Sequence, residues 1–250
     1  MSEEISPRIN ELNSLNEQFF FLGTMHIAQS SSEAVQKTIE ELDLDCVMIE
    51  LDQMRYQSLI DASQNVESNP SILEGKNISD SNNSHKKKDF MESLKEIQES
   101  IGKLLGITPG IEMISAIETV KKLQIPLRFI DRPILDTFQR MQDIHEDVQK
   151  EQEDLLESLE ENSIDSNSSE IQDLMEEMQK PGFLAELIED FKKNYPNIAT
   201  VLLTERNEYM VDQIMEYYQN HPNHRILIVT GAGHTQEMFL MVQKNLPVKP

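Results

Sequence analysis

Short apolar runs, each followed closely by a glycine or an aspartate, constrain the fold of this chain more than any other feature. They span residues 19–22, 46–51, 125–130 and 225–229. Runs of this length, rich in aromatic and branched side chains, indicate strands buried on both faces, because a buried helix needs a longer stretch. Apolar residues at helical spacing separate the runs, as in residues 33–42. Strands that alternate with helices predict an α/β protein with a mainly parallel central sheet flanked by helices.

Capping and proline signals predict where the helices begin. Ser30 and Glu33 form a capping box, and a proline suits the first position of a helix because its missing N–H is not needed there. We therefore expect helices that begin near Ser30, before Arg55, at Pro109, at Pro133, at Pro196 and near His234. The helix from Pro196 should be long and reach about residue 219.

The length of 250 residues favours one elaborated domain, which we expect over residues 16–250. Two segments inside it lack the apolar residues of a packed core. Residues 61–88 are rich in Ser, Asn, Asp and Lys, which predicts a mobile polar insertion. Residues 146–180 are rich in Glu, Asp, Ser and Gln, which predicts an acidic helical insertion with a solvated outer face.

Charge and cysteine content exclude several classes of function. The chain has 45 acidic and 22 basic side chains, and its net charge of −23 repels nucleic acids and anionic lipids. We interpret this acidity as an aid to solubility or an adaptation to salt rather than as attraction for a cationic ligand. Cys46 is the single cysteine, so no internal disulfide forms and a reducing compartment is expected. The polar start, MSEEISPRIN, and the lack of a long apolar run predict a cytoplasmic protein that is not integral to a membrane.

Polar residues follow the predicted strands at the edge where parallel sheets bind ligands. His26 follows the first run, Glu50 lies at the end of the second, Asp131 follows the third and His234 follows the last. Both histidines end a Gly-x-x-His turn, in which the glycine is expected to let the backbone approach a ligand closely. The remaining histidines lie in polar surroundings and are expected to face solvent; they are His85, His145, His221 and His224. Two imidazoles with one or two carboxylates suit zinc, manganese, cobalt or iron. Simpler interpretations stay open, because a histidine after a strand is commonly structural and a buried carboxylate commonly pairs with an arginine.

Glu205 adds a further candidate, because it falls on the same helical stripe as Ile198, Leu202 and Tyr209. An acid within an apolar stripe needs a partner or a function. A buried ion pair, with Arg55, Arg132 or Arg206 as partner, and a catalytic or ligand-binding role both explain it.

The common nucleotide and hydrolase motifs are excluded. Gly231-Ala232-Gly233 follows a strand and opens a helix, but Gln236 stands where a dinucleotide motif has its third glycine. The chain also lacks a P-loop, a Cys-x-x-Cys pair and a Gly-x-Ser-x-Gly elbow.

Six blocks, in order along the chain, resemble the TraB/PrgY family of pheromone-shutdown proteins. They are LGTMHIAQSS, VMIELDQMRYQSL, PGIEMISAIE, FIDRPILDTFQR, LLTERNEYMVDQI and IVTGAGHTQEM. Through the Gly-x-x-His turns the chain is also similar to the Tiki metalloproteases and, more distantly, to the erythromycin-esterase (EreA) and ChaN-like folds. The resemblance implies an α/β core of that kind with a site at one sheet edge. By way of Tiki, it implies a peptide-hydrolysing activity supported by manganese or cobalt, with zinc as an alternative.

The resemblance also implies the site residues, which are His26, Glu50, Arg55, Glu112, Asp131, Arg132, Arg140, Glu205, Arg206 and His234. Among them His26, His234, Glu50 and Asp131 are the candidate metal ligands. This chain departs from the family pattern at Asn207, where an aspartate is usual, and this change is expected to weaken a hydrogen bond. The membrane-spanning carboxyl-terminal part of many members does not occur in this sequence, so we expect a soluble form.

The leading interpretation is a metal-dependent peptidase or related hydrolase, in which His26, His234 and a carboxylate hold an ion that activates water. Glu50 or Glu205 would be the base, and the arginines would bind a substrate carboxylate or stabilise the oxyanion. Two alternatives stay open. One is a protein that sequesters a peptide or small ligand without turnover, and the other is a dimeric scaffold that uses the polar cluster as a buried network.

Overall fold

The computed structural model describes residues 12–24, 28–68, 111–144 and 182–247, with isolated positions between 148 and 155. The strands are β1 (Leu12–Leu15), β2 (Phe19–Thr24), β3 (Cys46–Ile49), β4 (Leu127–Phe129) and β5 (Ile226–Gly231). The helices are α1 (Ala28–Glu41), α2 (Gln53–Ser68), α4 (Ile111–Leu123), α5 (Ile134–Asp143), α8 (Phe183–Asn194), α9 (Pro196–Ala199), α10 (Glu205–Asn220) and α11 (Ala232–Asn245). A π-helix, η1 (Thr200–Thr204), joins α9 to α10.

The strands form one sheet in the order β1-β2-β5-β3-β4. β1 pairs antiparallel with β2, and the other neighbours are parallel, which confirms the predicted α/β class. The sequence had not indicated β1. The turn after it holds Asn16 and Glu17 at positive φ, as tight hairpin turns require. The finer resemblance to EreA, ChaN and Tiki folds stays a prediction.

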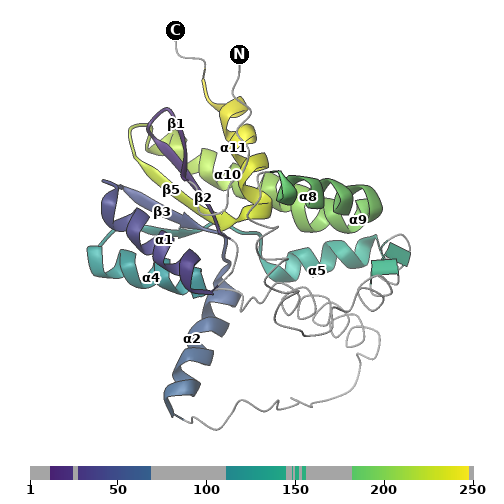
Figure 1. Ribbon diagram of the computed structural model, residues 1–250, viewed down its shortest axis with the longest axis horizontal. Coiled ribbons are helices and arrows are strands. Elements are labelled where there is room, and N and C mark those ends of the chain that lie inside the picture. Colours follow the sequence, from purple (N-terminus) through teal and green to yellow (C-terminus); the bar gives the residue numbers. More distant parts are fainter. Residues whose placement is uncertain are drawn as a thin grey trace.

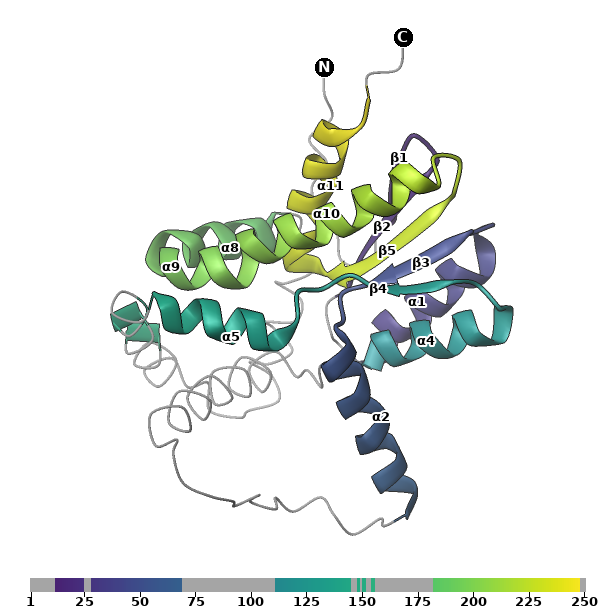
Figure 2. The ribbon, with the colours of Figure 1, turned by 180° about the vertical axis from the view of Figure 1, so that it is seen from behind.

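A separate hydrophobic core lies on each face of the sheet, because successive strand residues point to opposite faces. Phe19 and Phe21 pack with α10 and α11, whereas Phe20 and Leu22 pack with α1 and α4. Figures 1 and 2 show the resulting three layers. Helices α1 and α4 lie on one face of the sheet, and α10, which leads into β5, lies on the other face. In open α/β sheets, ligands commonly bind at the carboxyl ends of the strands where the chain changes side in this way.

The long helix predicted from Pro196 is interrupted. Within η1 the backbone N–H of Glu205 bonds to the carbonyl of Thr200, the i to i+5 pattern of a π-helix. This wider turn shifts the helical phase, so Leu202 and Tyr209 of the predicted stripe are only half-buried, whereas Ile198, which precedes η1, is buried. The buried residues of α10 are Asn207, Met210, Val211, Ile214 and Tyr217.

A third, smaller core lies away from the sheet, between α5 and the segment of α9 and η1. It contains Met141, Val148, Leu155, Ile198 and Val201. The carboxylate of Glu151 accepts the backbone N–H groups of Asn197 (3.1 Å) and Ile198 (2.9 Å), which caps the start of α9. The sequence had not indicated α8, which contacts α9 and α11.

The two predicted insertions fall mostly outside the described residues. α2 continues to Ser68, beyond the expected start of the polar insertion at residue 61, and it projects away from the sheet (Figure 1). Over the part of the chain that the structure describes, every helix is too short or too polar to cross a membrane.

Candidate functional site

Predicted site residues meet at the carboxyl ends of the parallel strands. Glu50 directly follows β3, Asp131 lies just beyond β4, and His234 is in the first turn of α11 after β5. Figure 2 shows the starts of α2, α5 and α11 gathered at this edge. The start of α10 brings Glu205 and Arg206 to the same place.

The guanidinium of Arg206 lies at the centre of the site. Its Nη2 donates to Glu50 Oε1 at 2.5 Å and to Asp131 Oδ2 at 2.6 Å, and its Nε donates to Asp131 Oδ1 at 3.0 Å. Its Nη1 lies 3.3 Å from His234 Nε2. One cation therefore contacts the three described residues that were predicted as metal ligands.

Asp131 is the most buried carboxylate of the group, with 2% of its side chain exposed. It also accepts the backbone N–H of Arg132 at 2.7 Å and a hydrogen bond from Nη2 of Arg55. Asp52 holds Arg55 in turn, because its Oδ2 accepts Arg55 Nε at 2.5 Å. The other Asp52 oxygen caps α2 by accepting the N–H of Met54 at 2.8 Å. A buried carboxylate is costly without partners, and these contacts supply them.

Glu205 belongs to a second, more exposed group. Arg132 Nη1 donates to Glu205 Oε2 at 2.9 Å, and Arg140 Nε donates to Oε1 at 2.8 Å. The Arg140 side chain is 40% exposed and that of Arg132 is 12% exposed. The structure thus supports the ion-pair interpretation of Glu205, with Arg140 as a partner that the sequence analysis had not named.

We call these eight side chains the arginine–carboxylate network, which consists of Arg55, Arg132, Arg140, Arg206, Glu50, Asp52, Asp131 and Glu205. Its four guanidinium charges balance its four carboxylates. The network is therefore close to neutral in a chain of net charge −23.

The π-helix orients two of these arginines. Arg132 Nη2 donates to the carbonyl of Val201 at 3.1 Å, and Arg206 Nη1 donates to the carbonyl of Leu202 at 3.0 Å. The wider π turn leaves these carbonyls available to side chains, and such turns are frequent at functional sites.

The hydrogen bonds of His234 define which ring nitrogen carries its proton. His234 Nδ1 lies 2.6 Å from Asn207 Oδ1, while Asn207 Nδ2 donates to Glu237 Oε2 at 3.0 Å. Because the second bond fixes the amide orientation, Nδ1 must donate a hydrogen to Oδ1. Nε2 then carries the lone pair of the neutral ring, 3.4 Å from Glu50 Oε1. Lys192 completes this chain by donating to Glu237 at 2.9 Å.

Burial and neighbouring charges shift the pKa values in this site. Burial alone would raise the pKa of Glu50, but positive charge on His234 and Arg206 and the N–H of Gly231 (2.7 Å) lower it to about 2. Burial lowers the pKa of His234, and the cation of Arg206 lowers it further against the opposing effect of Glu50. At neutral pH, where His234 is uncharged, Arg206 and the Gly231 N–H therefore keep Glu50 ionised.

The described residues do not form a complete metal site. No group of three His, Cys, Asp or Glu side chains within the described ranges is arranged to hold an ion. His26 lies outside the described residues, so the manganese, cobalt or zinc cofactor stays a prediction. Glu112 is buried in the first turn of α4, a helix that covers the face opposite to α10.

Comparison with known proteins agrees with this architecture. A family model described as TraB/PrgY/gumN matches residues 11–237. The chain belongs to the TraB/PrgY/gumN family. It is also similar to the uncharacterized protein MJ1365 of Methanocaldococcus jannaschii, with 28% identity over 257 aligned residues. That alignment covers 96% of this chain and 57% of MJ1365.

Three polar residues of this family member escaped prediction as part of the site, namely Asp52, Asn207 and Glu237. Asp52 carried a usable signal, because an aspartate between a strand and a helix is a typical N-cap. Asn207, noted only as a departure from the family pattern, is fully buried and orients His234. Its bond to His234, at 2.6 Å, is short rather than weak, and no local sequence signal indicates Glu237 as its partner.

Gly23 serves packing between β2 and α11. A Cβ at this position would lie 2.6 Å from Thr235 Oγ1 and 3.2 Å from the backbone of Ala232. The glycine thus lets α11 approach the strand closely, rather than letting the backbone approach a ligand. At Gly233 a Cβ would meet only Ile188 at 3.8 Å.

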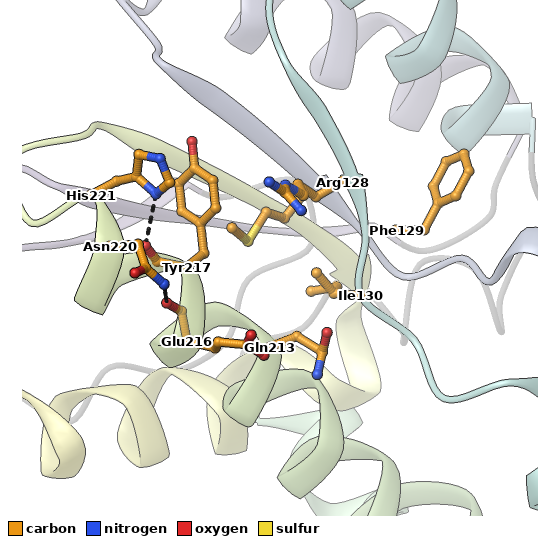
Figure 3. Close-up of a pocket in the computed structure, with 9 residues that line it drawn as sticks. Arg128, Phe129, Ile130, Gln213, Glu216, Tyr217, Asn220 and His221 are labelled. Carbon is orange, nitrogen blue, oxygen red and sulfur yellow. Dashed lines mark hydrogen bonds between the residues drawn. The ribbon is translucent and has the colours of Figure 1, made fainter.

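A separate cavity of about 220 Å³ lies between β4 and the carboxyl-terminal half of α10 (Figure 3). Its lining residues are Met48, Arg128, Phe129, Ile130, Gln213, Glu216, Tyr217, Asn220 and His221, none of which was predicted as a site residue. His221 and His224, expected to face solvent, are half-buried against Tyr217. The remaining histidines expected to face solvent, His85 and His145, lie outside the described residues.

Proposed function

We propose that this protein is a hydrolase of peptides in which His234 is the general base. The observation that supports this most strongly is the arrangement of His234, whose Nδ1 is fixed by Asn207 and whose Nε2 faces the Glu50 carboxylate at 3.4 Å. A base that is oriented by one group and faced by a second is the recurring element of hydrolytic sites.

His234 suits this role better than either glutamate proposed from the sequence. An efficient general base has a pKa near the working pH. The pKa of Glu50 is about 2, and bonds from Arg132 and Arg140 lower that of Glu205 despite its partial burial. Both carboxylates are therefore weak bases, whereas neutral His234 offers a lone pair. Its contact with Arg206, at 3.3 Å, is longer than a strong hydrogen bond, so a water molecule can compete for Nε2.

In this proposal His234 Nε2 takes a proton from water as the water oxygen attacks a peptide carbonyl. The ionised Glu50 then stabilises the imidazolium, which returns the proton to the leaving amine when the C–N bond breaks. The partly exposed guanidinium groups of Arg55 and Arg140, at 31% and 40% exposure, are suited to bind a substrate carboxylate or the oxyanion.

The test is peptide cleavage by the purified full chain, followed by mass spectrometry of a mixed peptide library with manganese, with cobalt or with a chelator. His234→Ala and Glu50→Gln should abolish cleavage. His221→Ala is the matched control, because this half-buried histidine lies in the cavity of Figure 3 and outside the arginine–carboxylate network, and it should retain activity.

Each other outcome contradicts the hydrolase. Saturable peptide binding without products would identify a sequestering protein, and a folded protein with neither signal would leave the network as a structural feature of a scaffold. Cleavage that survives in His234→Ala would assign the reaction to other residues.

A further inference from the structure

We infer that Arg206 occupies the place that a metal ion would take, so that the cation of this site is part of the polypeptide. The inference concerns the cation alone and does not depend on whether the protein hydrolyses peptides. The residues that carry it are the candidate metal ligands implied by the family resemblance.

All three described candidate ligands direct their donor atoms at one guanidinium. Glu50 Oε1 and Asp131 Oδ2 lie 2.5 Å and 2.6 Å from the same atom, Nη2. His234 Nε2 lies 3.3 Å from the neighbouring Nη1. Two carboxylate oxygens and an imidazole nitrogen are a donor set that zinc, cobalt or manganese commonly binds. Here these atoms surround the guanidinium of Arg206, which carries a permanent positive charge.

The surrounding hydrogen bonds hold the guanidinium in place. Arg206 Nη1 donates to the carbonyl of Leu202 within η1, and its Nε donates to Asp131 at 3.0 Å. A guanidinium keeps its charge in proteins, and this one lies within ion-pair distance of both Glu50 and Asp131. An ion entering this position would have to displace a side chain that donates four hydrogen bonds, and it would then meet the repulsion of a guanidinium left nearby.

His234 is nevertheless oriented as a metal-binding histidine would be. Metal-bound histidines commonly donate their second ring N–H to a carbonyl or carboxylate, which fixes the tautomer, and Asn207 does so here. Removal of Arg206 should therefore leave a cavity whose donor atoms can bind a metal ion. Two unpaired buried carboxylates would then favour a divalent cation strongly.

The experiment titrates chelator-treated protein with cobalt chloride alone, without peptide, and records the visible absorption of bound cobalt together with the melting temperature. The unsubstituted protein should show no stoichiometric cobalt band, and a chelator should leave its melting temperature unchanged. Arg206→Ala should bind one cobalt ion per chain at least ~100-fold more tightly, because the ion replaces a lost buried charge. Its melting temperature should rise with cobalt.

Two further variants separate this site from the rest of the acidic surface. Arg206→Lys keeps a cation between the carboxylates and should bind no more cobalt than the unsubstituted protein. The double variant Arg206→Ala with His234→Ala should lose the tight binding, because it lacks the nitrogen ligand.

Stoichiometric cobalt or manganese binding by the unsubstituted protein, lost in His234→Ala, would overturn the inference, as would a folded Arg206→Ala variant that gains no affinity. If Arg206→Ala does not fold, the titration of the unsubstituted protein still decides. Because no step uses a substrate, failure here is distinguishable from failure of the proposed hydrolase, which is judged by products.

Discussion

Replacement of Glu50 by glutamine should remove a pH-dependent part of the stability of the fold. The ionised Glu50 is bound by Arg206 and by the Gly231 N–H, and its pKa is lowered from 4.5 to about 2. At ~1.4 kcal/mol for each unit of pKa, this lowering corresponds to at most about 3.5 kcal/mol of stabilisation by the charged form. A lowered carboxyl pKa gives stability that is present above pH 4.5 and lost as the pH falls toward 2.

The assay is urea denaturation followed by circular dichroism at a series of pH values between about 7 and about 3. The free energy of unfolding of the unsubstituted protein should exceed that of Glu50→Gln most at neutral pH, and the difference should shrink by about 2 kcal/mol as the pH falls to about 3. Glu208→Gln, at an exposed position of α10, is the matched control and should show a small difference that does not vary with pH. A constant difference between the protein and Glu50→Gln across the whole range would refute the reasoning.

Three further changes test other parts of the structure. Gly23→Ala should cost about 1–3 kcal/mol in urea denaturation, because its Cβ would overlap α11, whereas Gly233→Ala should be neutral or stabilising by up to ~1 kcal/mol. Asn207→Asp should destabilise by about 1–3 kcal/mol, because it sets a carboxylate against Glu237, and the added Glu237→Gln change should restore most of that loss if charge repulsion is the cause. Glu151→Ala should cost about 1–2 kcal/mol and lower the melting temperature, because the first N–H groups of α9 would lose their acceptor.

The sheet was predictable because its strands carry their own signal. A strand buried on both faces is apolar throughout, so the runs at residues 19–22 and 225–229 identified β2 and β5 without knowledge of their neighbours. β1 was missed because it is an antiparallel edge strand of only four residues, in which Asn13 and Ser14 separate two leucines, so it has no continuous apolar run. The order of strands had no local signal, since it depends on which helices cover which face.

The convergence of the site was predictable only in outline. The rule that ligand-binding residues follow parallel strands correctly brought Glu50, Asp131 and His234 to one edge. It could not reveal that Arg206 lies among them, because the phase of α10 is set by η1. A five-residue π-helix follows no simple apolar periodicity, and the α-helical stripe drawn through Glu205 was half-buried for that reason.

The choice between an ion and an arginine has a consequence for chemistry. A metal held by histidine is lost when acid protonates the ligand or a chelator competes, whereas a guanidinium bound covalently to α10 stays in place under both conditions. The arginine lacks one capability of a metal, because a metal ion can lower the pKa of a bound water to about 7 and a guanidinium cannot. The proton must then go to a side chain, and Glu50 is a poor acceptor because Arg206 stabilises its charged form. In the proposed reaction His234 remains, and the guanidinium of Arg206 helps to keep it neutral. Under our two proposals, the residue that takes the place of the ion therefore also favours the neutral base that a reaction without an ion requires.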